Sequence, residues 1–312
     1  MIKRAFLIFS GYSPVVALAG LVTLFALLEP GFLSSFNIYS LLAQVALLGI
    51  TALGLTAAIS AGEFDVAIGS NFTFCSVVAM AFLAKGMPVT VAVSGALFFG
   101  LLIGLLKSAV IVKFRVHSIV ATLAIAVVLD GCSLVYTGGY RLYRGATPEF
   151  RFLGSGKLGL IPMPALIMLI MLVALWFLTT QTSLGWRLYS VGEQPQVARL
   201  LGVSPNRYKS YGLLISSLMA ALAGILYAAR TGTAEPFGKF AYTLDSFVAV
   251  TIGQTLLLRG KPNILGTLVG VFILGVLSNG VVLVGAPFFL QEIVKGVLIL
   301  IGVVIIARLQ WG

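Results

Sequence analysis

Runs of about 20 mostly apolar residues follow one another along almost the whole chain, and a run of that length can cross the hydrocarbon core of a bilayer as an α-helix. Only 9% of the 312 residues are charged, whereas soluble domains carry about 25%. No segment has the polar and apolar alternation of a membrane β-barrel strand. The sequence therefore predicts an all-α polytopic membrane protein.

Ten apolar runs are candidate transmembrane helices. The predicted spans are 5–28, 38–60, 66–84, 89–112, 117–137, 163–180, 210–230, 244–258, 264–284 and 289–307. The first run also resembles a secretory signal peptide, because basic residues precede it and Ala17-Leu18-Ala19 resembles a cleavage site. The run continues to Leu28, however, so we expect a retained first helix. An even number of spans places both termini on one side of the membrane.

The positions of lysine and arginine predict the orientation, because cytoplasmic loops of membrane proteins carry an excess of both. With the N-terminus inside, twelve of the 20 cations lie at cytoplasmic ends of spans, and four others lie in one long external loop, 138–162. We therefore expect both termini in the cytoplasm. The twelve are Lys3, Arg4, Lys107, Lys113, Arg115, Arg187, Arg199, Arg207, Lys209, Arg259, Lys261 and Arg308.

Two glycine-rich spans resemble each other. Gly95 and Gly104 correspond to Gly266 and Gly275, each 171 residues further along the chain. The two spans are the fourth and the ninth, so they cross the membrane in opposite directions. This pattern predicts a 5+5 inverted repeat within one transmembrane domain, with halves of roughly 1–137 and 163–312. The alternative is chance similarity between two helices rich in Gly, Leu and Val.

Residues for catalysis or metal binding are scarce. The chain has one histidine, His117, and no HExxH pattern, and "GQTLLLRGKP" has too many residues between its glycines for a phosphate-binding loop. Glu292 and Lys295 are three residues apart on one helix face and are expected to pair. We therefore predict no catalytic residue, no metal site and no cofactor, and any ATP must bind to another subunit.

A short polar segment, "GEQPQVARLLGV" from 192 to 203, interrupts the apolar runs. Pro195 suits the first turn of a helix, and Gly202 suits the left-handed residue after its end. One apolar face of this helix consists of Val197, Leu200 and Leu201, while Gln196 and Arg199 point elsewhere. Such a helix can rest on lipid, pack on its own bundle, or enter a groove on a partner protein.

Several motifs resemble those of one transporter family. They are "GEFDVAIGS" (62–70), "GEQPQVARLLGVSPNRYK" (192–209), "ALAGILYAARTGTAEP" (221–236), "YTLDSFVAVTIGQTLLLRGKPNILGTLVGVFILGVLSNG" (242–280) and "EIVKGVLILIGVV" (292–304). In order and spacing they resemble the permease subunits of bacterial ABC importers for monosaccharides. That group includes the ribose, xylose, arabinose, galactose and autoinducer-2 systems.

The resemblance implies a permease subunit in the bacterial inner membrane, working by alternating access. Its implied partners are a second permease copy, identical or paralogous, a cytoplasmic ABC ATPase subunit and a periplasmic substrate-binding protein. The coupling segment, 186–209, would dock on the ATPase through Glu193, Gln196, Val197, Ala198, Arg199, Leu200, Leu201 and Gly202. Arg141, Arg144 and Lys239, in the external loops 138–162 and 231–243, are candidate contacts for the binding protein.

Candidate residues of the translocation path are Asp65, Ser70, Asn71 and Asn279. Asp65 precedes the predicted span 66–84, so it either caps that helix or contacts substrate. The amide of Asn279 must hydrogen-bond to a neighbouring helix or to a polar solute. This chain departs from the pattern of that family at two places. Many of its members have a serine where this chain has Ala67, and paired glycines where this chain has Gly253-Gln254.

The sugar itself is not predicted, because the residues that select it are expected on the binding protein. The alternatives are a nucleoside or branched-chain amino acid ABC permease and an ion-coupled secondary transporter. The ion-coupled secondary transporter is disfavoured because the spans contain no central charged relay. An intramembrane enzyme is disfavoured because they contain no catalytic pair.

Overall fold

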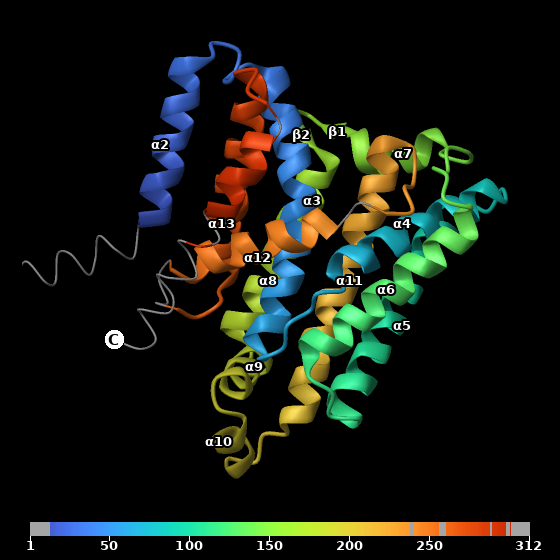
Figure 1. Ribbon diagram of the computed structural model, residues 1–312, viewed down its shortest axis with the longest axis vertical. Coiled ribbons are helices and arrows are strands. Elements are labelled where there is room, and N and C mark those ends of the chain that lie inside the picture. Colours follow the sequence, from blue (N-terminus) through green and yellow to red (C-terminus); the bar gives the residue numbers. More distant parts are fainter. Residues whose placement is uncertain (1–12, 238–239, 256–259, 288, 298–299, 301–312) are drawn as a thin grey trace, which may run out of the picture.

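The computed structural model describes residues 13–237, 240–255, 260–287, 289–297 and 300. Long helices run side by side, with one short helix, α10, beyond the end of the bundle (Figure 1). The main helices are α2 (Ser13–Leu28), α3 (Ser35–Ser60), α4 (Ile68–Ala84), α5 (Val89–Ser108), α6 (Ser118–Thr137), α8 (Met163–Gln181), α11 (Pro205–Thr231), α12 (Phe240–Gln254) and α13 (Ile264–Leu283). A π-helical turn, η1 (Ala109–Lys113), extends α5. The predicted all-α polytopic class is confirmed.

The predicted count of ten spans is not confirmed. Among the described residues, six helices are long and apolar enough to cross a membrane: α3, α5 with η1, α6, α8, α11 and α13. The predicted spans 66–84 and 244–258 form shorter helices of 17 and 15 residues, α4 and α12. Of the last predicted span, residues 289–297 are helical, and the rest lies largely outside the described residues.

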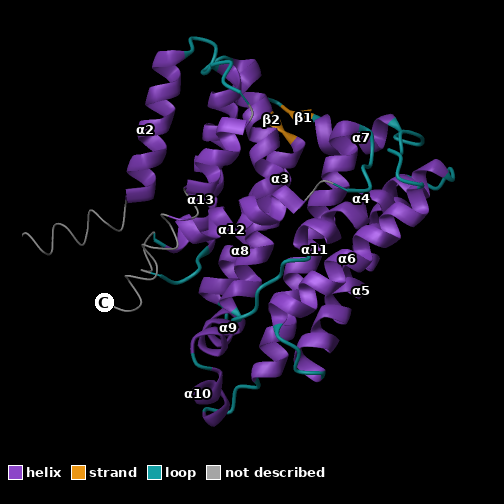
Figure 2. Ribbon diagram, in the orientation of Figure 1, coloured by secondary structure: helices purple, strands orange, loops and turns teal. Residues whose placement is uncertain are grey.

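Three short elements were not predicted. They are α7 (Pro148–Ser155), α9 (Ser183–Glu193) and a β-hairpin whose strands, β1 (Lys157–Leu158) and β2 (Ile161–Pro162), have two residues each (Figure 2). Thr147 caps α7, its hydroxyl accepting the Phe150 N–H at 3.4 Å. Their segments lack a long apolar run, so hydropathy alone gives no signal for them.

Helices α3 and α11 form the centre of the bundle. Helix α11 packs against α3, α4 and α5, while α3 also packs against α8, α12 and α13. Small residues allow the close approaches: a Cβ added at Gly224 of α11 would meet the backbone of Phe72 in α4, and one at Gly54 of α3 would meet Met219 of α11. Small residues let helices pack closely in lipid, where the hydrophobic effect does not drive them together.

Helix boundaries in the two halves correspond at the offset of 171 residues. That shift carries α3, of 26 residues, onto α11, of 27, and α4 onto α12, within one residue at each end. The shifted α5 overlaps α13 but begins and ends four residues before it. In Figure 1, α3 runs down towards α9 while α11 runs up from α10 towards α7. A Cβ at Gly95 would meet Phe82 of α4, and one at Gly266 would meet Gly253 of α12, 171 residues after Phe82.

Candidate functional site

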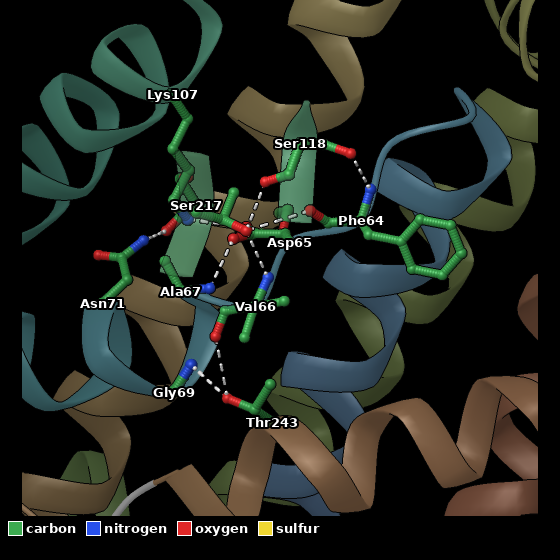
Figure 3. A network of polar contacts seen from close by, with 12 residues as sticks. Phe64, Asp65, Val66, Ala67, Gly69, Asn71, Lys107, Ser118, Ser217 and Thr243 are labelled. Carbon is green, nitrogen blue, oxygen red and sulfur yellow. Dashed lines mark hydrogen bonds and ion pairs between the residues drawn. The ribbon is translucent and has the colours of Figure 1, made fainter. Parts of the chain in front are cut away.

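The linker between α3 and α4, residues 61–67, continues the hydrogen bonds of α3 as far as Glu63, whose N–H donates to the Ala58 carbonyl at 3.0 Å. Side-chain hydroxyl groups of α6 accept hydrogen bonds from the linker backbone. Ser118 Oγ accepts the Phe64 N–H at 3.3 Å, and Thr122 Oγ1 accepts the Val66 N–H at 3.0 Å. In the first turn of α4, the Gly69 N–H donates to Thr243 Oγ1 of α12 at 3.0 Å (Figure 3). Such partners are needed because an unpaired buried amide is costly.

Asp65, at the middle of this linker, forms a fully buried ion pair. Lys107 Nζ of α5 and Ser216 Oγ of α11 each donate to Asp65 Oδ2 at 2.7 Å, and both side chains of the ion pair are 0% exposed. The other carboxylate oxygen accepts the Ala67 N–H at 3.1 Å. A single carboxylate thus joins the linker to two helices that are distant in sequence.

Two expectations for this region need correction. Lys107 was counted among the cations at the membrane surface, but it lies inside the protein against Asp65. Capping of the next helix was one of the two roles considered for Asp65, but the N-cap residue of α4 is Ala67, and no side chain caps that helix. The carboxylate accepts one backbone N–H before the helix, and its other oxygen is used by Lys107 and Ser216.

Two other path candidates, Ser70 and Asn71, lie in the first turns of α4 and are buried. Ser70 Oγ donates to Asp130 Oδ2 of α6 at 3.0 Å. The Asn71 amide nitrogen donates to the backbone oxygen of Ser217 in α11 at 3.0 Å, which Figure 3 also shows. Both therefore connect α4 to neighbouring helices.

The remaining path candidate, Asn279, pairs with a second asparagine. Its amide and that of Asn37 at the start of α3 exchange two hydrogen bonds, of 2.8 and 2.9 Å. The predicted pairing of Glu292 and Lys295 is confirmed at 3.2 Å, and Lys295 Nζ also contacts Asp245 Oδ2 of α12 at 3.1 Å. Neither Asn37 nor Asp245 was recognised as a partner, because partners distant in sequence leave no local signal.

The predicted helix in the polar segment is α10 (Pro195–Leu200). Pro195 occupies its first turn, and Gly202 after its end has φ of 80°, as expected. Ala198 is 2% exposed and packs with Leu188 and Val191 of α9 and with Tyr208 of α11. Ala198 therefore anchors α10 to the bundle.

Among the residues that the structure describes, none covers the apolar face predicted for α10. Leu200 is 86% exposed, Leu201 70% and Val197 46%. Glu193, at the end of α9, forms an ion pair of 2.6 Å with Lys261 in the segment before α13. Leu200 and Leu201 are therefore exposed on α10, which lies at one end of the bundle (Figure 1).

The two loops assigned to one external surface lie in contact. Leu142 and Ala234 form an isolated antiparallel bridge, and Arg141 Nη2 pairs with Glu235 Oε1 at 3.1 Å. Arg144 is exposed, while Lys239 lies outside the described residues.

A cavity of about 550 Å³ opens between the end of α3, α9 and the segment before α13, with Phe64, Tyr189 and Gln254 among its lining residues. Burial raises the pKa of the Tyr189 phenol. Among the residues that the structure describes, no group of three or more His, Cys, Asp or Glu side chains could hold a metal ion.

Apolar helices of membrane-spanning length, with polar side chains paired between them, define a multi-pass membrane protein. Residues 37–303 match the family described as "Branched-chain amino acid transport system / permease component". The chain belongs to this permease family.

Curated relatives cover almost the whole chain. It is 35% identical to the ribose import permease protein RbsC of Escherichia coli K12, over 93% of this chain and 92% of the relative, and 35% identical to that of Bacillus subtilis 168, over 94% and 91%. The galactofuranose transporter permease protein YtfT of Escherichia coli K12 is 30% identical over 96% and 90%. No solved structure matches the chain.

Proposed function

We propose that this chain is the permease subunit of an ABC importer for a monosaccharide or a related small sugar. The observation that carries the proposal is the identity of 35% to ribose import permeases over more than nine-tenths of both chains. A further relative, the L-arabinose ABC transporter permease protein AraH of Azospirillum brasilense, is 28% identical over 90% of this chain. ATP hydrolysis then belongs to another subunit.

The proposed partners are an ABC ATPase, a substrate-binding protein and a second permease copy. The open face of α10, formed by Val197, Leu200 and Leu201, fits an apolar groove on the ATPase. The α10 end of the bundle is then cytoplasmic, and both termini are too. Loops 138–162 and 231–243 then face the periplasm, in a bacterial inner membrane.

Alternating access between two related halves is the proposed mechanism. The matching lengths of α3 and α11, and the matching glycine contacts of α5 with α4 and of α13 with α12, support an inverted repeat. In transporters with inverted repeats, one half rocks against the other around a central path. The pairs Asp65–Lys107, Ser70–Asp130 and Asn37–Asn279 join elements distant in sequence. We expect them to lie beside that path and to exchange partners as it opens.

Uptake of labelled sugars tests the proposal. In a strain that lacks this chain, we expect uptake of at least one pentose or hexose to fall at least tenfold and to return with the gene on a plasmid. Labelled leucine is the matched control, because the family description names branched-chain amino acids. Loss of leucine uptake with unchanged uptake of every sugar would contradict the sugar assignment.

Reversing the charge of Arg144 is expected to weaken association of the substrate-binding protein about tenfold, because charges at an interface rim steer and hold the partner. Arg144 is the cleaner site of the two predicted arginines, since Arg141 already pairs with Glu235. Surface plasmon resonance on Arg144→Glu, Arg141→Glu and the control Lys157→Glu, all exposed in the same loop, measures the effect. An unchanged affinity for both arginine variants would show that these arginines do not contribute to binding of the substrate-binding protein.

A further inference from the structure

A second cavity, of about 380 Å³, lies at the α10 end of the bundle. It opens between the residues that follow α3, the turn from η1 to α6, both ends of α10 and the start of α11. Its polar lining residues include Glu63, Arg115, His117, Arg199, Asn206 and Lys209. The apolar face proposed to dock on the ATPase, formed by Val197, Leu200 and Leu201, does not line this cavity.

The cavity carries an excess of positive charge. Lys209 Nζ lies 2.6 Å from Glu63 Oε1, so these two charges balance each other. Arg115 and Arg199 also line it, and neither forms an ion pair with any carboxylate among the described residues. Two guanidinium groups from separate elements therefore share a cavity without a counter-charge.

Two long helices begin at this cavity. His117 and Ser118 at the start of α6 line it, as do Pro205 and Asn206 at the start of α11. No side chain caps either helix. The unsatisfied N–H groups and the positive end of the helix dipole make a helix start favourable for an anion, and phosphate groups bind there.

The backbone of Arg115 is held in an unusual conformation. It has φ of 57°, and it is the one residue other than glycine with positive φ in the described part of the chain. This region is unfavourable for a residue with a long side chain. Strained backbone of this kind often occurs at ligand sites.

We propose that this cavity binds a phosphate group, held by Arg115 and Arg199 at the start of α6 and α11. Guanidinium groups suit phosphate because they donate paired hydrogen bonds to its oxygens. The volume accommodates the headgroup of an anionic phospholipid or a small phosphorylated metabolite such as a sugar phosphate. Both present the same chemistry to the cavity.

A bound phosphate would join two elements that touch little otherwise. Arg199 belongs to α10, and Arg115 to the turn between η1 and α6. The ligand would therefore hold the docking helix against the bundle and regulate how it moves. This inference does not depend on which solute the chain transports.

Thermal unfolding of the purified, delipidated full chain tests the proposal. The probes are inorganic phosphate against chloride at equal ionic strength, a pentose phosphate against the free pentose, and phosphatidylglycerol against phosphatidylcholine in mixed micelles. We expect a rise in Tm with a phosphate probe, and at least a tenfold loss of apparent affinity in Arg199→Gln. Arg207→Gln is the control, because Arg207 lies in the same turn of α11 as Asn206 but does not line the cavity.

Arg115→Gly separates binding from folding. Glycine adopts positive φ without strain, so this variant should unfold at the same or a higher temperature without ligand, yet bind the phosphate probe at least tenfold more weakly. A response to soluble phosphates assigns a metabolite, and a response to phosphatidylglycerol alone assigns a lipid headgroup. No response to any of the phosphate probes, or equal losses in Arg199→Gln and Arg207→Gln, would overturn the proposal.

Discussion

Replacing Lys107 with methionine is expected to lower the free energy of unfolding by about 3–5 kcal/mol, the cost of leaving a buried charge without its partner. The Asp65 carboxylate is 0% exposed, and Lys107 supplies its only counter-charge among the described residues. Ser216 and the Ala67 N–H would still donate to the carboxylate, but neither carries charge. Thermal unfolding of the purified chain and its yield in membranes measure the effect.

The double variant Asp65→Asn with Lys107→Met is expected to recover much of this loss. Removing both charges of a buried pair is far less costly than removing one, and well-packed neutral replacements are often tolerated. Lys113→Met is the matched control, since Lys113 follows in η1, is exposed and forms no ion pair within the described part of the chain. A double variant no more stable than Lys107→Met would show that packing of the lysine stem, rather than its charge, is responsible.

Replacing Leu200 with aspartate is expected to abolish co-purification of the ATPase subunit. Leu200 is 86% exposed in the isolated chain, so the variant should fold normally. At the centre of an interface a large apolar side chain contributes about 2 kcal/mol or more, and a buried aspartate adds a desolvation cost. The expected weakening is therefore at least about 30-fold. Mass spectrometry of proteins purified with the tagged chain from native membranes measures it.

Leu160→Asp is the control for this experiment. Leu160 is 92% exposed and lies in the hairpin between β1 and β2, away from α10. It should retain the ATPase at the level of the unmodified chain. If Leu200→Asp retains the ATPase as well, α10 is not the docking element, and an interfacial helix resting on lipid becomes the better interpretation.

Local patterns in the sequence were sufficient for the long helices and for α10. Apolar runs predicted the long helices, because the requirement to satisfy every backbone group in lipid leaves few alternatives. Pro195 and Gly202 marked the ends of α10 correctly, because the first turn and the residue after the end restrict φ within a few residues. The same method missed α7 and α9, which have no long apolar run.

The polar contacts could not be predicted in this way. Lys107 was assigned to the cytoplasmic end of a span because cytoplasmic loops of membrane proteins carry an excess of lysine and arginine. Its partner Asp65 is 42 residues away, and Ser216 is 151 residues from Asp65. Asn279 was recognised as needing a partner, but only the packing of α13 against α3 identified Asn37.

The sequence by itself determined the class of protein, the positions of the long helices and the ends of the polar helix, because hydrophobic length and backbone preferences act locally. Only the tertiary structure decided which buried charges pair, which cations surround a cavity, and which face of α10 is open. Those outcomes depend on contacts between helices distant in sequence, where burial makes an unpaired charge costly and so selects its partner.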